Sequence, residues 1–217
     1  QIAEEQERLG ATISAGAGWR LQDRDSALYH PANGNLYGLP TGRGGNSDDG
    51  NLNYSKNDLY SSVVKFIGDV ELKKDNYGGL FRVKAWYDYA LNNKSVPHGN
   101  EANNYVRNSK LSDAGAEPLA KYDGVYLMDA YVYGNWKLDG GHSVNTRLGR
   151  QVLNWGESLF IQGVNQISPI DVSALRRPGV EIKEALIPVG LLSASWGIPN
   201  GPSVDAFYQF QWEQTTV

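Results

Sequence analysis

The 217-residue sequence contains no cysteine, a single methionine and no apolar run of the roughly 18 residues that a transmembrane helix needs. The absence of cysteine is compatible with a protein of the cell envelope, although many cytosolic proteins also lack it. The formal net charge of −4 provides no basic surface for nucleic acid, so we predict no nucleic-acid partner. Residues 1–8 lack the apolar core of a signal peptide, so an exported protein would be present here in its mature form.

Glycine and aromatic residues are abundant instead: 25 Gly, 13 Tyr and 6 Trp favour strands, turns and membrane interfaces over helices. Seven segments alternate apolar and polar residues with the period of two that a β-strand produces. In the first of them, Ile13 and Trp19 share the apolar face, whereas Thr12 and Arg20 share the polar face. The segments are residues 9–22, 61–73, 80–90, 124–136, 143–153, 186–198 and 203–214.

The connections between these segments alternate in length. Long polar connections span residues 22–60, 91–121 and 154–184, and tight turns span residues 74–79, 137–142 and 198–202. Strands able to cross a tilted bilayer, with long loops on one side and short turns on the other, are typical of bacterial outer-membrane proteins. We therefore predict an all-β fold, an antiparallel up-and-down transmembrane β-barrel located in the bacterial outer membrane.

The strand number adds a further expectation. Single-chain bacterial barrels normally have an even number of strands, and an open sheet edge in lipid leaves backbone groups unpaired. We therefore expect residues 1–217 to form a single β-barrel domain that is the N-terminal portion, about seven strands, of a larger barrel.

A soluble β ligand-binding module is the alternative, because a lipocalin-like barrel or a sandwich also alternates, with its apolar face inside. Three features favour the membrane protein: long loops on one side only, charges of both signs at strand centres, and aromatic residues at strand ends. With the first strand running towards the long loops, Trp19, Tyr87, Tyr89 and Trp212 form one girdle, and Phe81, Trp136 and Trp196 form the other.

One segment and one single residue do not follow the simple alternation of apolar and polar side chains. In residues 124–136 we expect Asp129, Tyr131 and Tyr133 to point inward, with an outward set that consists of Met128, Ala130, Val132 and Trp136. Arg150 points at lipid by parity; a bulge at Gly149 that turns it inward and snorkelling of its long side chain to the rim are both compatible with the sequence.

The polar face provides the candidate pore-lining residues, whose charges would set the selectivity of a channel. A network of charges that neutralise one another is an equally good interpretation. The pore-lining and constriction candidates are Arg20, Lys65, Asp69, Arg82, Lys84, Asp129, Arg147, Gln151, Asp171, Arg176 and Arg177, and Glu71, Lys73, Asp88 and Asp205 share the same face.

Residues 154–184 are the best functional candidate among the loops, because they are too apolar for a loop in solvent. We predict that they fold into the lumen as a constriction or partial plug. Arg176 and Arg177, followed by Pro178-Gly179, would place positive charge there, and guanidinium groups bind carboxylates and phosphates well. The alternative is a structural loop whose arginines pair with lumen Asp and Glu.

Other chemistry has little support. Asp48, Asp49 and Asn51 are hard oxygen ligands, but the spacing of an EF-hand is absent, so they are a weak calcium candidate. The histidines His30, His98 and His142 form no metal-spaced pair, and no Gly-x-Ser-x-Gly motif is present. We predict no enzymatic activity and no cofactor.

Several motifs closely resemble the domain-of-unknown-function 1302 family of Gram-negative outer-membrane proteins over nearly the whole chain. Their positions are Trp19–Asp25, Asn46–Tyr54, Asp129–Asn135, Arg147–Gln151, Trp155–Ser158, the highly specific Asp171–Gly179, Lys183–Leu186 and Ala206–Gln209. The resemblance implies a longer natural chain and a role in moving apolar or lipid-like molecules across the outer membrane. It also implies periplasmic lipid-carrier-like proteins and inner-membrane exporters as partners, and it supplies no catalytic residues.

Together these features predict a channel or transporter for hydrophobic or amphipathic small molecules or lipids, in contact with outer-membrane lipid and lipopolysaccharide. A non-transporting outer-membrane scaffold or surface-binding protein is the first alternative. The soluble module is the second.

Overall fold

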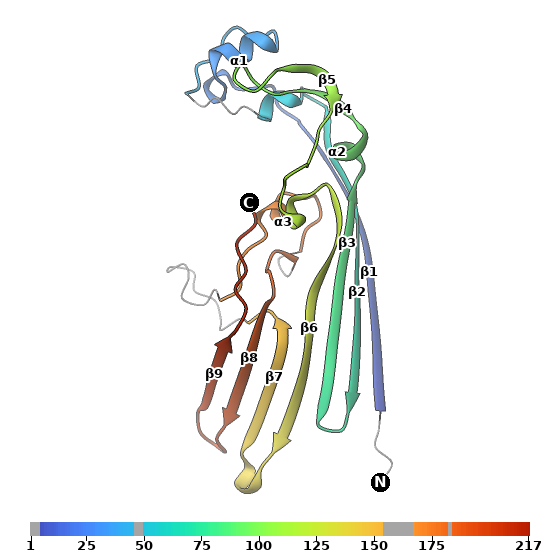
Figure 1. Cartoon of the computed structure of the whole chain (residues 1–217), viewed down its shortest axis with the longest axis vertical. Helices are drawn as coiled ribbons and strands as arrows, with labels where there is room; N and C mark the ends of the chain where they lie inside the picture. Colours follow the sequence, from blue (N-terminus) through green and yellow to red (C-terminus); the bar gives the residue numbers. More distant parts are fainter. Residues whose placement is uncertain (1–4, 46–49, 154–166, 182–183) are drawn as a thin grey trace.

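A computed structural model describes residues 5–45, 50–153, 167–181 and 184–217. These residues form an antiparallel sheet of seven strands in the order β1-β2-β3-β6-β7-β8-β9, so each strand pairs with the next sheet strand along the chain (Figure 1). The predicted all-β fold and up-and-down strand order are therefore confirmed. The strands are β1 (Glu5–Trp19), β2 (Leu59–Lys74), β3 (Tyr77–Asp88), β6 (Asp123–Lys137), β7 (Ser143–Gln151), β8 (Val189–Gly197) and β9 (Ser203–Gln209).

The predicted difference between the two ends of the sheet is also present. The short turns β2–β3, β6–β7 and β8–β9 lie together at the bottom of Figure 1, the short-turn end, and the long connections lie at the opposite, long-loop end. Left-handed residues make these turns tight: Asp75 has φ 51°, Gly140 has φ 75° and Asn200 has φ 52°. The local turn chemistry thus sets the meander in which neighbouring strands pair.

The long connections fold into a cap above the sheet. The cap comprises η1 (Ser26–Leu28), α1 (Pro31–Leu36) and η2 (Gly50–Asn53) from the first connection and α2 (Tyr89–Asn93), β4 (Ser95–His98), β5 (Val106–Lys110) and η3 (Pro118–Ala120) from the second. The Tyr37 hydroxyl donates to the Gly99 carbonyl at 3.0 Å, and the rings of Tyr37 and Tyr105 lie 4.9 Å apart. Tyr29 and Leu52 are almost fully buried inside it.

In a water-soluble protein the buried face of a sheet is apolar and the exposed face is polar. In this sheet the lysines lie on the buried face, and the exposed face is apolar. We call the face that carries Lys65 and Lys84 the inner face; both lysines are 5% exposed. On the opposite, outer face Ile13 is 75% exposed, and other exposed apolar residues are Leu9, Val64, Phe66, Val70, Leu72, Phe81, Val125, Val132, Leu148, Leu192 and Tyr208. The apolar stripe predicted from the alternation therefore does not form a core.

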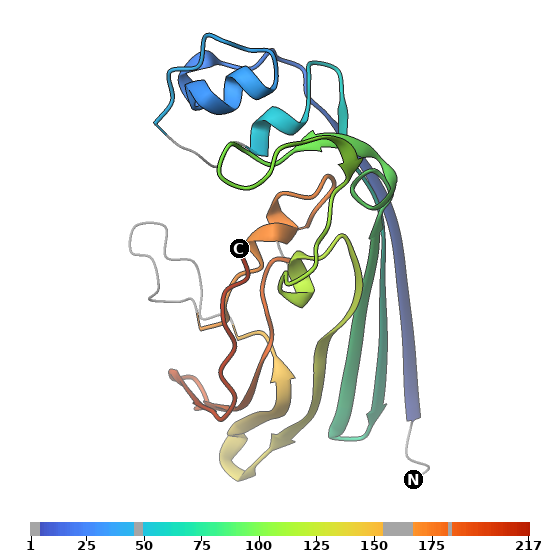
Figure 2. The same ribbon diagram turned by 45° about the horizontal axis from the view of Figure 1, so that its top comes forward.

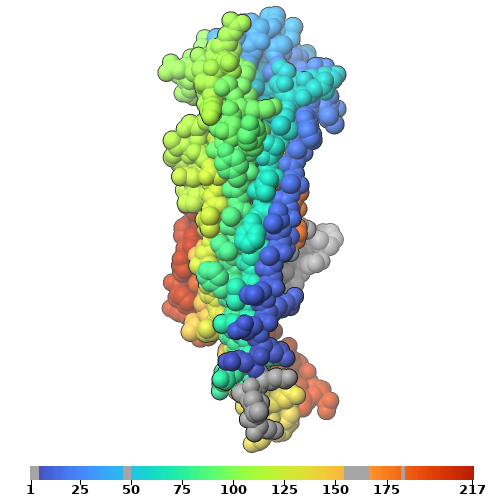
Figure 3. Space-filling model, turned by 90° about the vertical axis from the view of Figure 1, so that its right-hand side faces the viewer, coloured from blue at the N-terminus to red at the C-terminus, as the bar shows by residue number. Residues whose placement is uncertain are grey.

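The sheet curves around the inner face, and α3 (Val172–Leu175) lies on that side (Figure 2). Figure 3 views the molecule from the side of β1, β2 and β3, whose bands run side by side along most of its length. Within the described residues β1 and β9 each pair on one side only, so the sheet is open there. In the same residues, no helix combines the length and the apolarity required to span a bilayer.

An irregularity in β6 changes the face of one predicted residue. The β3–β6 register shifts between Phe81 and Val83, so Val83 pairs with Leu127. The prediction that Met128 faces outward is therefore wrong: Met128 is 4% exposed, and Val125 and Leu127 lie on the outer face instead. A bulge of this kind inserts one residue and reverses the parity of the strand beyond it.

Candidate functional site

The segment after β7 binds the inner face of the sheet, and we call its described residues 168–181 and 184–188 the inner segment. Within it Asp171 caps α3: its Oδ1 accepts from the backbone N–H of Ala174 at 2.9 Å and from the Ser173 hydroxyl at 2.5 Å. This capping explains why a helix begins directly after Asp171. The helix ends at Leu175 with Arg176 as its C-cap, and the turn at Pro178 and Gly179 (φ 69°) reverses the chain.

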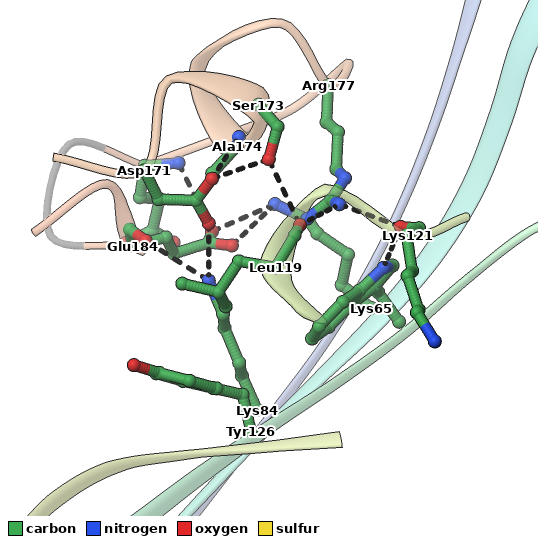
Figure 4. Close-up of polar contacts among 12 residues, drawn as sticks. Lys65, Lys84, Leu119, Lys121, Tyr126, Asp171, Ser173, Ala174, Arg177 and Glu184 are labelled. Atoms are coloured by element: carbon green, nitrogen blue, oxygen red, sulfur yellow. Dashed lines mark hydrogen bonds and ion pairs between the residues drawn. The ribbon is translucent and has the colours of Figure 1, made fainter. Parts of the chain in front are cut away.

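Two buried ion pairs join the inner segment to the sheet (Figure 4). The Lys65 ammonium lies 2.8 Å from a carboxylate oxygen of Glu184, and the Lys84 ammonium lies 3.1 Å from Asp171. All four side chains are at most 7% exposed. Lys65 also donates to the Gly179 carbonyl at 2.7 Å, so its charge is shared with the turn of the segment. Charges buried to this degree must be paired, and here the partners come from distant parts of the chain.

Arg177 connects the inner segment to the second long connection. Its guanidinium carbon lies 4.7 Å from the centre of the Trp86 ring, and its Nη2 donates to the carbonyls of Leu119 at 2.6 Å and Lys121 at 3.0 Å. Burial lowers the pKa of Arg177 from its ordinary value, and Asp171 is the strongest of the nearby carboxylates that raise it. The Trp86 indole donates to the same Lys121 carbonyl at 2.9 Å, which fixes the ring under the guanidinium.

Apolar packing supports these polar contacts. Val63, Trp86, Leu119 and Ile187 form a buried cluster on the inner face, with Tyr126 packed against it. The cluster joins β2 and β3 to η3 and to the inner segment. Because burial of such side chains is worth roughly 1.5–3 kcal/mol each, the segment is held by more than its ion pairs.

Gly16 lets the inner segment approach β1. A Cβ atom at Gly16 would lie 2.7 Å from the Pro178 carbonyl oxygen and 2.9 Å from the Pro178 Cβ, closer than real Cβ atoms come. A side chain at this position therefore requires the turn at Pro178 to move.

We expect Gly16→Val to displace this turn and destabilise it by about 1–3 kcal/mol through overpacking. The measurement is the rate of trypsin cleavage after Arg176, which should rise as the turn leaves the wall. Gly10→Val is the matched control, because the three atoms nearest to a Cβ at Gly10 all belong to the movable Asp69 side chain. Equal cleavage of both variants and the natural protein would show that Pro178 does not rest on β1.

Nearer the short-turn end the inner face carries a second polar group of residues. Arg82 lies 3.1 Å from Asp129 and 3.9 Å from Asp69. The Tyr133 hydroxyl donates to Glu71 at 2.7 Å. A hollow of about 470 Å³ on this face is lined by Asn145, Arg147, Ser193, Ser195 and Asp205, among others. The predicted polar lining is thus largely a set of paired charges beside an open polar hollow.

The structure brings some candidates together and separates others. Lys65, Lys84, Asp171 and Arg177 meet at the inner segment, and Asp69, Arg82 and Asp129 meet below it. Gln151 is 1% exposed and donates to the Leu191 carbonyl, and Arg147 lies 5.6 Å from the Tyr131 ring. Arg176 is exposed at the end of α3.

Arg20 does not join either group. It follows β1, and its guanidinium donates to the carbonyls of Gln22 at 3.0 Å and Asn51 at 2.8 Å, so it supports the cap. Asn51 belongs to η2, whereas the calcium candidates Asp48 and Asp49 lie outside the described residues. Residues 154–166 and 182–183 of the predicted plug also lie outside them.

Three functional residues were missing from the candidates: Glu184, Trp86 and Gly16. The signal for Glu184 was available in principle, because inner-face lysines flanked by apolar positions need a carboxylate partner. The charged groups that pair with one another also differ from those expected. The carboxylates of the inner segment pair with lysines of the sheet, and Arg177 donates to backbone carbonyls, in place of the expected Arg–Asp and Arg–Glu pairs.

Comparison with known protein families gives a match over nearly the whole chain. A family model described as "Protein of unknown function (DUF1302)" matches residues 3–217, which covers the whole sheet, the cap and the inner segment. No curated protein and no solved structure matches the sequence.

Proposed function

This chain belongs to the DUF1302 family, and on that premise we propose that it is part of a β-barrel of the bacterial outer membrane. The barrel conducts hydrophobic or amphipathic small molecules, and the inner segment forms its constriction. The proposal agrees with the resemblance of the motifs to Gram-negative outer-membrane proteins.

The observation that carries the proposal is the reversed burial of the sheet. Ile13 is 75% exposed and Leu72 is 52% exposed, while Lys65 and Lys84 are 5% exposed. In water such an arrangement leaves apolar surface solvated, at a cost of about 25 cal/mol per Å². In a bilayer the same outer face contacts hydrocarbon, and the polar face lines the interior, as in known outer-membrane barrels.

Aromatic residues at both ends of the strands support a membrane position. At the short-turn end the Tyr77 and Trp136 rings lie 6.4 Å apart, and Trp196 is 47% exposed. At the long-loop end Trp19 is 54% exposed and Tyr89 is 60% exposed. Exposed aromatic residues in two bands are the arrangement that membrane interfaces favour.

Closure of the barrel is also part of the proposal. The free edges of β1 and β9 would each present unpaired backbone groups to lipid, at a cost of several kcal/mol per group. We infer that additional strands, from a longer chain or from other copies, pair with these edges in the membrane.

In this proposal the inner segment determines which molecules pass through the barrel. Its Ile187 packs in the buried apolar cluster with Val63, Trp86 and Leu119, whereas the open hollow below it is polar. A molecule that crosses the barrel meets the polar hollow, and it meets the buried apolar side chains once the inner segment moves, which suits an amphipathic substrate better than a simple ion. The periplasmic lipid-carrier-like protein and the inner-membrane exporter stay predicted partners.

A specific observation favours the non-transporting alternative. The cap is folded, and the inner segment covers the upper inner face with two buried ion pairs, so the interior could be filled for a structural purpose. The two functions differ in one respect: a transporter must move the inner segment or leave a path beside it, and a scaffold has no such need.

The absence of cysteine allows a direct test of transport. The Gly16→Cys/Pro178→Cys pair places two Cβ atoms in contact, because a Cβ at Gly16 lies 2.9 Å from the Pro178 Cβ, and a small outward movement of the turn brings them to the 3.5–4.5 Å that a disulfide requires. We expect the full natural protein in liposomes to conduct a neutral fluorescent amphiphile. We expect the oxidised pair to lose most of this flux and to regain it on reduction.

The single-cysteine variants are the controls. Flux in the natural protein that oxidation of the pair leaves unchanged would assign the path to another part of the interior. Insertion into the bilayer without flux of any solute would favour the scaffold, and a monodisperse protein in water without detergent would contradict the membrane assignment.

A further inference from the structure

A groove crosses the outer face of the sheet near the short-turn end. Its volume is about 750 Å³, and its lining includes Leu72, Tyr77, Gly79, Val132, Trp136 and Leu148. These residues belong to β2, β3, β6 and β7, each of which pairs with a neighbouring strand on both sides. Strands added at the free edges of β1 and β9 would therefore leave the groove uncovered.

The apolar part of the groove follows one row of residues across the sheet. In the register, successive partners along this row are Leu72, Gly79, Val132, Leu148 and Leu192. The four aliphatic side chains are 43–60% exposed, whereas Gly79 has no side chain. A Cβ at Gly79 would lie 3.6 Å from the Tyr131 carbonyl oxygen, an ordinary van der Waals contact, so the space above it is open. Gly79 thus leaves a hollow in an otherwise continuous apolar row.

Two aromatic side chains bound the groove on the side of the short turns. The Trp136 ring lies over Gly134, because a Cβ at Gly134 would come closer to this ring than real Cβ atoms come. The rings of Tyr77 and Trp136 lie 6.4 Å apart. In the proposed membrane position these rings lie at the interface, so the apolar row lies at the depth where acyl chains begin.

The rim of the groove at the same end carries charges of both signs. Lys74 of β2 and Glu5 and Glu7 of β1 belong to its lining. The Lys74 ammonium lies 3.6 Å from Glu5, and the two side chains are 60% and 73% exposed. An ion pair as exposed as this contributes little, so both groups stay available to a ligand. One ammonium beside two carboxylates complements a head group that contains both a phosphate and an ammonium.

We propose that the groove binds a phospholipid with a zwitterionic ethanolamine head group, with an acyl chain in the hollow at Gly79. This inference rests on the membrane position in the proposed function and adds a lipid site outside the path through the interior. In an outer-membrane barrel the short turns face the periplasm, where the leaflet consists of phospholipid. Lys74 faces the phosphate, and Glu5 and Glu7 face the ammonium. The volume lies within the roughly 300–1,000 Å³ of ligand pockets.

The test uses the full natural protein in phosphatidylglycerol liposomes. These contain a small fraction of phosphatidylethanolamine or phosphatidylglycerol that bears a photoactivated diazirine in one acyl chain. We expect phosphatidylethanolamine to label the peptides 72–79 and 132–136 more strongly than the peptide around Ile13, and phosphatidylglycerol to label all three alike.

Two tryptophan variants test whether the hollow itself binds the chain. Gly79→Trp fills the hollow and should reduce phosphatidylethanolamine labelling of the groove about tenfold. Ala11→Trp is the matched control, because Ala11 is exposed on the outer face of β1 and lies outside the groove lining.

A charge reversal tests the head group separately. Glu7→Lys leaves the hollow unchanged and gives the rim two ammonium groups and one carboxylate, so phosphatidylglycerol labelling of the groove should rise to that of phosphatidylethanolamine. Insertion should not change, because Glu7 is exposed near the start of β1.

Three results would overturn the inference and leave the proposed function intact in a protein that inserts and conducts. The first is labelling spread evenly over the outer face and insensitive to Gly79→Trp. The second is equal groove labelling by both lipids that Glu7→Lys does not alter. The third is cross-linking of two protein copies through the groove, which would assign it to a contact between barrels. Failure to insert into the liposomes, scored by protease protection, would overturn both proposals.

Discussion

Lys65→Met is expected to destabilise the protein by about 3–5 kcal/mol, because it leaves the Glu184 carboxylate buried without its counter-ion. Methionine keeps most of the packing of the lysine stem, so the loss of stability measures the effect of removing the charge. The measurement is the shift of the urea unfolding midpoint in lipid vesicles at constant slope. The inner segment should also become more sensitive to trypsin at Arg176, since Lys65 holds both Glu184 and Gly179.

The double variant Lys65→Met/Glu184→Gln tests whether the two buried charges act as a pair. It removes both charges and retains an acceptor for the Glu181 N–H, so we expect most of the lost stability to return. Lys73→Met, at an exposed position on the same strand and face, should change stability by less than about 0.5 kcal/mol. A double variant as unstable as Lys65→Met would show that the pair does not act as a unit.

Ile13→Arg is expected to cost about 2–4 kcal/mol in a bilayer and almost nothing in water. Ile13 lies near the middle of β1 on the outer face and is 75% exposed. At such a site in a soluble protein, a polar replacement changes stability by about 0.5 kcal/mol or less. The same substitution therefore distinguishes hydrocarbon from water as the surroundings of the outer face.

The matched control is Thr12→Arg, the neighbouring residue of β1 on the inner face, where a wet interior tolerates charge. The measurement compares unfolding free energies in phosphatidylcholine vesicles for the natural protein and the two variants. Equal stability for all three would contradict a lipid-facing Ile13, and with it the membrane position of the sheet.

The sequence predicted the strands well because alternation is a local property. The pattern around Ile13, Phe66 and Phe81 identifies three strands and their faces, and the register pairs these faces across neighbouring strands. The prediction was wrong at Met128, where a shift in pairing inside β6 reversed the parity. Such a shift depends on how one strand meets the next, which alternation within a single strand cannot indicate.

The inner segment was predicted only in part. Apolar residues and a turn motif indicated that Asp171–Gly179 does not lie in solvent, and the segment binds the inner face. Its partners were not predicted, because Lys65 and Glu184 are 119 residues apart in the chain. The partners of Arg20 were not predicted either: parity placed it on the inner face, and the first long connection folds over it and provides two carbonyl acceptors.

By itself the sequence determined which residues form strands, which strands are neighbours and which face of each strand is apolar, because period-two alternation and short turns act over a few residues. Only the tertiary structure decided what lies against the inner face, how its lysines are neutralised, and where the pairing of β6 with β7 ends. Those features depend on contacts between segments far apart in the chain, and the energy of a buried charge or an open strand edge is set by whatever the fold places beside it.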